Sequence, residues 1–257
     1  MSNDSVSKRA GSTEKVPRFQ AIIEHLRQQI HSGTWPEHTA LPPERTLAER
    51  FGISRMTARR ALLAIETEGL AYSAGRRGRF VSPARLTYDI GNMVSFSAHA
   101  QRDDLGLSIK VISSGVIAAD TTLASRLPVE MGEEFYKYTR LFLIKDHPTF
   151  IEEEFVIARL FPDLLERDLT QSTTLLLERH YDTAAHTGNI VIRMRALREE
   201  EAGLLGLATY QAGIELEQLI CDKSGQPFCF GRQIWRGELA EFTAQAVVRD
   251  KTDIQSK

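Results

Sequence analysis

The first third of the chain carries apolar residues at the spacing of three short helices. Residues 17–32 have them three and four positions apart, which predicts an amphipathic helix. A second helix is predicted over residues 43–51, and Gly52 after it suits the left-handed position that ends many helices. Ser54 is a good N-cap for a third helix that runs to about residue 68. The pattern therefore predicts three helices, the last two joined by a tight turn.

After these helices the apolar pattern changes to that of strands. Residues 70–73 and 79–82 predict a short hairpin with a glycine-rich tip, and residues 83–93, which contain Pro83 and Gly91, predict a linker. Longer β-rich segments follow at 107–118, 134–145, 149–157, 188–197, 213–222 and 227–236. Helical segments are predicted between them at 97–104, 121–127, 172–180 and 198–206. Because neighbouring strands are close in the chain, we expect an antiparallel α+β domain.

The composition is that of a protein with an ordinary apolar core. The 257 residues are 42% hydrophobic and 26% charged, and no apolar run reaches the roughly 18 residues of a membrane span. Residues 1–15 lack the apolar segment of a signal peptide, so we expect a disordered tail and a cytoplasmic protein. The net charge of −2 combines +5 over residues 1–82 with −7 over the rest, which suggests that the first part meets a polyanion.

Basic residues gather on the third predicted helix and on the hairpin tip. Arg55 and Arg59 are four positions apart, so they share one edge of the helix. Arginine can hold guanine or phosphate through two N–H groups, which favours a helix that reads a DNA groove. The alternative is an ordinary solvated helix face. It is less favoured because no Asp or Glu lies between positions 54 and 65 to balance the charge.

The segment LPPERTLAERFGISRMTARRALLAIETEGLAYSAGRRGRFV closely resembles the signature of the GntR family of transcriptional regulators. The resemblance covers about residues 17–82 and implies a winged helix-turn-helix fold, with the hairpin tip at the minor groove. Pro43 stands where the family usually has serine, and it replaces a side-chain cap with a preformed first helical turn. The candidate DNA-binding residues are Arg45, Ser54, Arg55, Thr57, Arg59, Arg60, Gly75, Arg76, Arg77, Gly78 and Arg79.

The rest of the chain resembles the ligand-sensing UTRA domain of the HutC subfamily. The resemblance covers about residues 94–240, in stretches such as YTRLFLIKDHPTFIEEEFV and DKSGQPFCFGRQIWRG, and implies the antiparallel α+β fold of chorismate lyase. The expected organisation is a disordered tail (1–15), a winged helix-turn-helix DNA-binding domain (16–82), a linker (83–93), a UTRA-like ligand-binding domain (94–248) and a second tail (249–257).

A small-molecule effector is expected in this second domain. Ser95 and Ser97 lie where a helix should begin, and their hydroxyls with free backbone N–H groups favour an anion. Arg140 lies in an apolar strand and therefore needs an anionic partner, either an effector or one of the glutamates 152–154. An acid replaces Cys229 in family members that sense amino-sugar phosphates, so the resemblance does not imply that ligand class here. The candidate effector-binding residues are Ser95, Phe96, Ser97, Tyr138, Arg140, Glu152, Ser172, Thr174 and Trp235.

Other chemistry finds little support in the sequence. The histidines lack metal-ligand spacing, Cys221 and Cys229 are expected to be reduced, and we expect no cofactor, metal or catalytic site. The alternative functions are a lyase-like enzyme, for which no acid–base motif is present, and a purely architectural DNA-binding protein. We expect a repressor that binds a pseudo-palindromic operator as a homodimer and responds to a small anionic effector.

Overall fold

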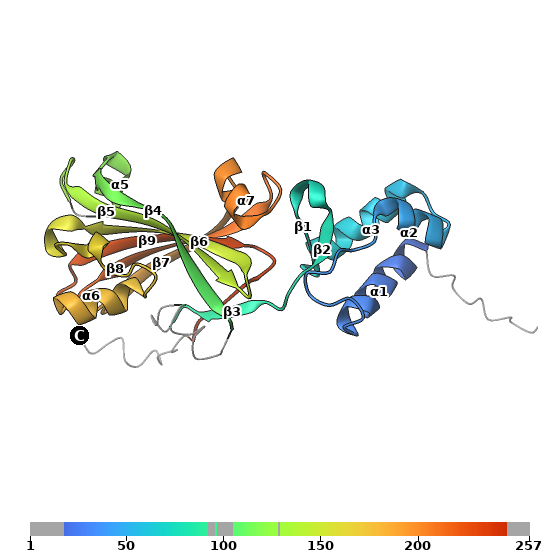
Figure 1. The fold of residues 1–257 in the computed structure, drawn as a ribbon, viewed down its shortest axis with the longest axis horizontal. Coiled ribbons are helices and arrows are strands. Elements are labelled where there is room, and N and C mark those ends of the chain that lie inside the picture. Colours follow the sequence, from blue (N-terminus) through green and yellow to red (C-terminus); the bar gives the residue numbers. More distant parts are fainter. Residues whose placement is uncertain (1–17, 92–95, 97–104, 128, 246–257) are drawn as a thin grey trace, which may run out of the picture.

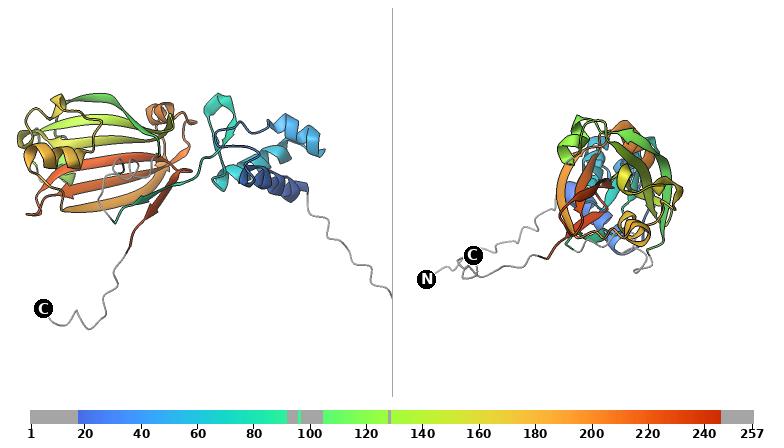
Figure 2. Two further views of the ribbon diagram at one scale, coloured as in Figure 1. Left: turned by 60° about the horizontal axis from the view of Figure 1, so that its bottom comes forward. Right: turned by 90° about the vertical axis from the view of Figure 1, so that its left-hand side faces the viewer.

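The computed structural model describes residues 18–91, 96, 105–127 and 129–245. Both expected tails, the helix predicted over 97–104, and the candidates Ser95 and Ser97 lie outside the described residues. A helical domain and a sheet domain lie end to end along the long axis of the molecule, and a short hairpin lies between them (Figures 1 and 2).

The first domain has the three helices and the hairpin that the sequence predicts. Ile22, Leu47 and Ile65, one from each helix, are completely buried in a common core. Gly52 has φ 59° and ends the second helix, and the Ser54 hydroxyl accepts a hydrogen bond from the Thr57 N–H at 3.1 Å to begin the third. The elements are α1 (Arg18–His31), α2 (Glu44–Phe51), α3 (Arg55–Thr67), β1 (Ala71–Ser73), a 3₁₀ turn (Gly75–Arg77) and β2 (Arg79–Val81).

The second domain contains a six-stranded antiparallel sheet with the strand order β4-β5-β6-β9-β8-β7. The predictions for these strands are confirmed to within two residues at each end, because each strand has a continuous apolar or alternating pattern. The strands are β4 (Leu107–Ala118), β5 (Glu134–Ile144), β6 (His147–Ile157), β7 (Thr187–Ala196), β8 (Ala212–Cys221) and β9 (Pro227–Arg236). The helices are α5 (Thr121–Arg126), α6 (Thr173–Tyr181) and α7 (Glu199–Leu205), with 3₁₀ turns at Ala158–Leu160 and Leu164–Glu166.

Both faces of the sheet are covered by helices or by added strands. Helices α5 and α7 lie on one side, and α6 lies on the other with the segment that contains β3 (Figure 1). The alternation of each strand explains this arrangement, since one set of side chains packs under α7 and the other under α6. The confirmed fold class is α+β, with a helix-turn-helix domain before an antiparallel sheet domain.

One strand of a parallel pair lies within the segment that the sequence predicts to be a linker. Strand β3 (Leu86–Asp89) pairs with β10 (Ala240–Thr243), so the connection between the domains is held by the end of the chain. Tyr88 on β3 is buried and stacks on Trp235 of the sheet, with ring centroids 5.9 Å apart. The pattern of residues 86–89 is too short to predict this pairing, which depends on a partner about 150 residues away.

The part of the hairpin nearer its tip packs against the sheet domain. Tyr72 and Ala74 are buried in an apolar cluster that also contains Ile151 and Ile234. The guanidinium carbon of Arg236 lies 4.2 Å from the centroid of the Tyr72 ring, the geometry of a cation–π contact. Ala71 and Val81 at the base of the hairpin belong to the core of the first domain, so the hairpin contributes to both cores.

Candidate DNA-binding surface and effector site

The start of α3 presents the groove-reading residues that the sequence predicts. Arg55 and Arg59 are exposed on this helix, and 57% of the Arg59 side chain is accessible. Ala58 on the opposite side of the helix is completely buried against the other helices. The helix thus packs by its small apolar residues and leaves its arginines in solvent.

Glutamates of α2 form weak ion pairs with Arg59 of α3 and with Arg45 of α2 itself. The Nε atom of Arg59 lies 4.0 Å from Glu44, and Arg45 lies 3.6 Å from Glu49. All four side chains are largely exposed or half-exposed, and exposed pairs of this kind contribute about 1 kcal/mol or less. Both arginines can therefore exchange a carboxylate for a DNA phosphate at little cost. Arg60 lies over the ring of Phe19 at 5.2 Å instead.

The hairpin arginines differ from one another. Arg79 is only 19% exposed and pairs with Glu66 at 3.1 Å and Glu44 at 3.4 Å, so it ties the hairpin to α2 and α3. Arg77 donates a hydrogen bond to the carbonyl oxygen of Gly206 in the second domain at 3.3 Å. Nothing is described of the Arg76 side chain. Gly75 and Gly78 have positive φ angles of 54° and 106°, which the tight tip requires.

The candidate effector site is a cavity between the sheet and α6. Five predicted residues line it, namely Phe96, Arg140, Glu152, Ser172 and Thr174. Two predicted residues do not. Tyr138 is buried with its hydroxyl 2.9 Å from that of Thr173, and Trp235 is completely buried among aromatic rings. The further lining residues are Tyr88, Ile90, Phe142, Glu154, Thr173, Ile190, Leu216, Gln218, Ile220 and Gln233.

Arg140 forms the internal ion pair that was one of the two alternatives for it. Its Nε and Nη2 atoms donate to the Glu152 carboxylate, and the Nε bond is 2.9 Å long. Nη1 donates to the carbonyl oxygens of Leu169 and Gln171 at 2.9 and 2.6 Å, and Nη2 also donates to the Thr173 hydroxyl at 2.9 Å. A guanidinium has five N–H groups, so each one already has an acceptor within the protein.

The other polar groups of the cavity form a chain that starts from Glu152. Its second carboxylate oxygen accepts a hydrogen bond from the Gln233 amide at 2.9 Å, and Gln233 accepts one from the Trp235 indole N–H at 2.9 Å. Glu154 lies two positions along β6, on the same face, and accepts a hydrogen bond from the Cys229 thiol at 2.9 Å. The sequence signal for Glu154 was the alternation of three glutamates along one strand, which places Glu152 and Glu154 together.

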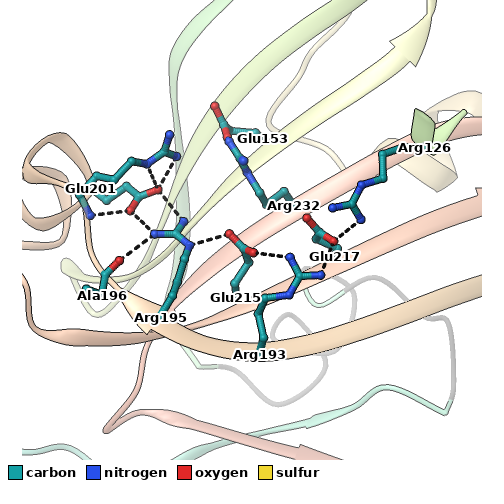
Figure 3. Close-up of polar contacts among 10 residues, drawn as sticks. Arg126, Glu153, Arg193, Arg195, Ala196, Glu201, Glu215, Glu217 and Arg232 are labelled. Atoms are coloured by element: carbon teal, nitrogen blue, oxygen red, sulfur yellow. Dashed lines mark hydrogen bonds and ion pairs between the residues drawn. The ribbon is translucent and has the colours of Figure 1, made fainter. Parts of the chain in front are cut away.

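A second group of charges lies on the opposite face of the sheet (Figure 3). Glu153 pairs there with Arg232, and Glu215 accepts from Arg193 and Arg195 at 3.0 and 2.6 Å. Each acid in this network faces at least one arginine, and the burial of Glu201 is outweighed by hydrogen bonds from Arg195, so its pKa falls to about 2. The network joins β7, β8, β9 and α7 and contrasts with the cavity, where acids outnumber arginines.

We expect Glu154→Gln to remove part of the pH dependence of stability. Burial and the charge of Glu152 raise the pKa of Glu154 from 4.5 to about 8, against the opposing effects of Arg140 and Cys229. The folded state then holds a proton that the unfolded state has lost, so stability falls as pH rises from about 5 to about 8. Urea unfolding across this range should show a flatter profile for Glu154→Gln than for the wild type. A pH profile unchanged by the substitution would contradict the raised pKa of Glu154.

Comparisons with known proteins agree with both domains. The model of the bacterial regulatory proteins, gntR family, matches residues 19–81, and that of the UTRA domain matches residues 104–241. The transcriptional repressor NagR of Bacillus subtilis is 28% identical over 227 residues, which are 88% of this chain and 93% of that protein. The histidine utilization repressor of Pseudomonas aeruginosa is 30% identical over 162 residues, 61% of this chain and 63% of that protein.

Solved structures show the same fold. PhnF from Mycobacterium smegmatis aligns with a TM-score of 0.62 at 22% identity, over 89% of this chain and all of that one. A DNA-binding head with an attached sensing domain defines the class of ligand-responsive transcription factors. The chain belongs to the GntR family, in its HutC type with a UTRA domain. It is therefore a DNA-binding transcriptional repressor that senses a small molecule. Because the family consists of transcriptional regulators, the alternative of a lyase-like enzyme is wrong.

Proposed function

We propose that this repressor binds a pseudo-palindromic operator as a homodimer, with one copy of α3 in the major groove of each half-site. The exposed Arg55 and Arg59 at the start of α3 are the observation that carries this proposal. Arg45 supports it from α2, where its side chain is 69% exposed. The hairpin candidates are proposed to follow the minor groove, for which Arg77 has to leave the Gly206 carbonyl and Arg79 its two glutamates. Among the described residues no helix is long and apolar enough to cross a membrane, and we propose that the protein works in the cytoplasm.

We propose that the effector binds in the cavity beside α6 and alters the hairpin through β9. Gln233 on this strand faces the cavity, whereas Ile234 and Arg236 contact the hairpin side chains. A shift of β9 on effector binding would then move the DNA-binding head of one protomer relative to its partner. Coupling free energies of this kind are typically about 1–3 kcal/mol, enough for a large change in operator affinity.

The sequence predicts that the effector is anionic, and this prediction requires a rearrangement at Arg140. An anion that binds Arg140 has to take the guanidinium from Glu152 and from the carbonyl oxygens that hold it. The candidates Ser172 and Thr174 would be its further donors, and their hydroxyl oxygens lie 3.2 Å apart at the start of α6.

Arg59→Ala is expected to weaken operator binding by about 1–3 kcal/mol, the range for a lost bidentate contact with a base. Arg55→Ala is expected to act in the same direction. Arg179→Ala is the matched control, because it removes the same charge from an exposed position on α6 in the second domain. Titration of a labelled operator by gel shift measures all three. Equal affinity of the Arg59 and Arg179 variants would reject the proposed role of α3.

A further inference from the structure

The cavity beside α6 holds more acidic than basic side chains. Its ionisable side chains are one arginine, Arg140, and two glutamates, Glu152 and Glu154, and all three are at least 95% buried. Every N–H of Arg140 is already used inside the protein. An anion would therefore meet two buried acidic side chains and no free guanidinium N–H.

Glu152 is satisfied in the same way as Arg140. One of its carboxylate oxygens accepts from Arg140 and the other from the Gln233 amide at 2.9 Å. Arg140 and Glu152 form an ion pair without net charge, in which every N–H group and both carboxylate oxygens have partners within the protein. The charge of this pair is not available to a ligand of either sign.

Glu154 has weaker partners. The Cys229 thiol donates to one oxygen at 2.9 Å, and a thiol is a weak donor. The other oxygen lies 3.7 Å from Nη2 of Arg140, beyond hydrogen-bond distance, and the Thr173 hydroxyl is the remaining donor beside this carboxyl. Glu154 is thus the acid of the cavity without a hydrogen-bonded cation, because its ion-pair contact with Arg140 is longer than that of Glu152.

The walls of the cavity, like Glu154, favour a ligand with a positive charge. Phe96 and Tyr88 present aromatic rings to it, and Leu216 and Ile190 add apolar surface. The Phe142 ring also lines the cavity, but it already stacks on Phe150 and lies under the Arg140 guanidinium. Aromatic faces attract ammonium and guanidinium groups, and the attraction strengthens where water is excluded. A carboxylate beside aromatic rings is the combination that binds an organic cation.

We propose that the effector of this repressor carries a protonated nitrogen, of the amine or guanidine class, and that Glu154 binds it. The proposal rests on the cavity being the effector site. In it Arg140 holds Glu152 in place and does not touch the ligand. The apolar part of the effector lies against the aromatic wall.

The proposal predicts that ligand binding releases a proton. Burial and Glu152 raise the pKa of Glu154 to about 8, against the effects of Arg140 and Cys229. Tyr138 on β5 and Tyr88 on β3 are its further titratable neighbours. At pH 7 the carboxyl holds a proton, which a bound cation would expel. Binding should release close to one proton at pH 7, and cation affinity should rise from pH 6 to pH 8.

The test uses the full-length protein and probes that differ in one group. The cavity is small, about 40 Å³, so the panel starts with butylamine, butylguanidine, valerate and butanol. Tyramine, 4-hydroxyphenylacetate and tyrosol form a larger set with one skeleton. Thermal shift ranks the probes, and calorimetry in two buffers of different ionisation enthalpy counts the protons released. We expect the amines and the guanidine to raise the melting temperature and the acids to leave it unchanged.

Two isosteric variants separate the proposed contact from a general charge effect. Glu154→Gln should weaken amine binding at least tenfold at pH 8 and abolish the proton release. Glu153→Gln removes the same charge from the next position of β6, on the other face, where Glu153 pairs with Arg232 and Lys137. It should bind amines like the wild type. Equal amine affinity in both variants, or no amine binding at all, would overturn the proposal.

Operator titration with each probe distinguishes the two proposals from each other. If an acid releases the operator and no amine does, the regulatory function stands and the ligand class is wrong. If amines bind through Glu154 and leave operator affinity unchanged, the ligand class stands and the regulatory role of the cavity is wrong.

Discussion

Trp235→Ala is expected to lower the free energy of unfolding by about 3–5 kcal/mol, the range for removing a large buried aromatic side chain. The Trp235 ring is completely buried and stacks on Phe150, with centroids 4.0 Å apart and planes 17° apart. Phe96 meets it edge-on at 5.1 Å. The loss is large because a large-to-small substitution leaves a cavity that the surrounding side chains fill only in part. Urea unfolding followed by near-ultraviolet circular dichroism measures the loss.

Trp235→Phe is the control that separates packing from ligand contact. It keeps most of the ring and loses the N–H that Gln233 accepts at 2.9 Å, so we expect a smaller loss, about 1–3 kcal/mol. The resemblance to the family places Trp235 among the effector-binding residues, whereas the structure places it behind Gln233. A near-normal stability of Trp235→Ala together with lost effector binding would contradict the structural role.

Local signals made the helix-turn-helix predictable. Gly52 and Ser54 act on the residues beside them, one by a left-handed backbone and the other by a hydrogen bond three residues away. The six long strands were predictable for a similar reason, since each has its own apolar pattern. The β3–β10 pair was not, because each strand is only four residues long and its partner is distant in the chain.

The cavity was predictable only in part. An arginine in an apolar strand indicates that an acid is near, and the glutamates of β6 were recognised as its possible partners. Which of them pairs with Arg140 depends on strand register, and β5–β6 pairing sets Arg140 opposite Glu152. Gln233 lies opposite Glu152 on β9 through a second pairing, which joins positions about 80 residues apart. Sequence spacing contains no information about that register.

Arg79 shows the same limit on the DNA-binding side. A basic residue beside a glycine-rich tip is typical of a hairpin that meets DNA. Its partners Glu66 and Glu44 come from two earlier helices, and only the folded domain brings them within 3.4 Å. The DNA-binding role of Arg79 stays a prediction, while its structural role follows from these contacts.

Arg140→Met is expected to destabilise the protein by about 3–5 kcal/mol, the cost of breaking a buried ion pair by removing one partner. The change leaves Glu152 and Glu154 buried without a cation, since these are the acids that face Arg140 at close range. Carboxyl groups in such a site take up protons in the folded state at a pH where they are ionised in the unfolded state. The destabilisation should therefore be larger at pH 8 than at pH 5. Chemical unfolding at both pH values measures it.

The double variant Arg140→Met with Glu152→Gln distinguishes a structural role of Arg140 from a role in effector binding. It removes both charges of the Arg140–Glu152 ion pair. Most of the lost stability should return, because replacing a buried ion pair as a whole costs little. If Arg140 acts only on Glu152, the refolded double variant keeps Glu154 and should still bind a cationic probe. If Arg140 binds the effector directly, stability should return without binding. If both stability and binding are restored, Arg140 has a structural role in the cavity and Glu154 recognises the effector.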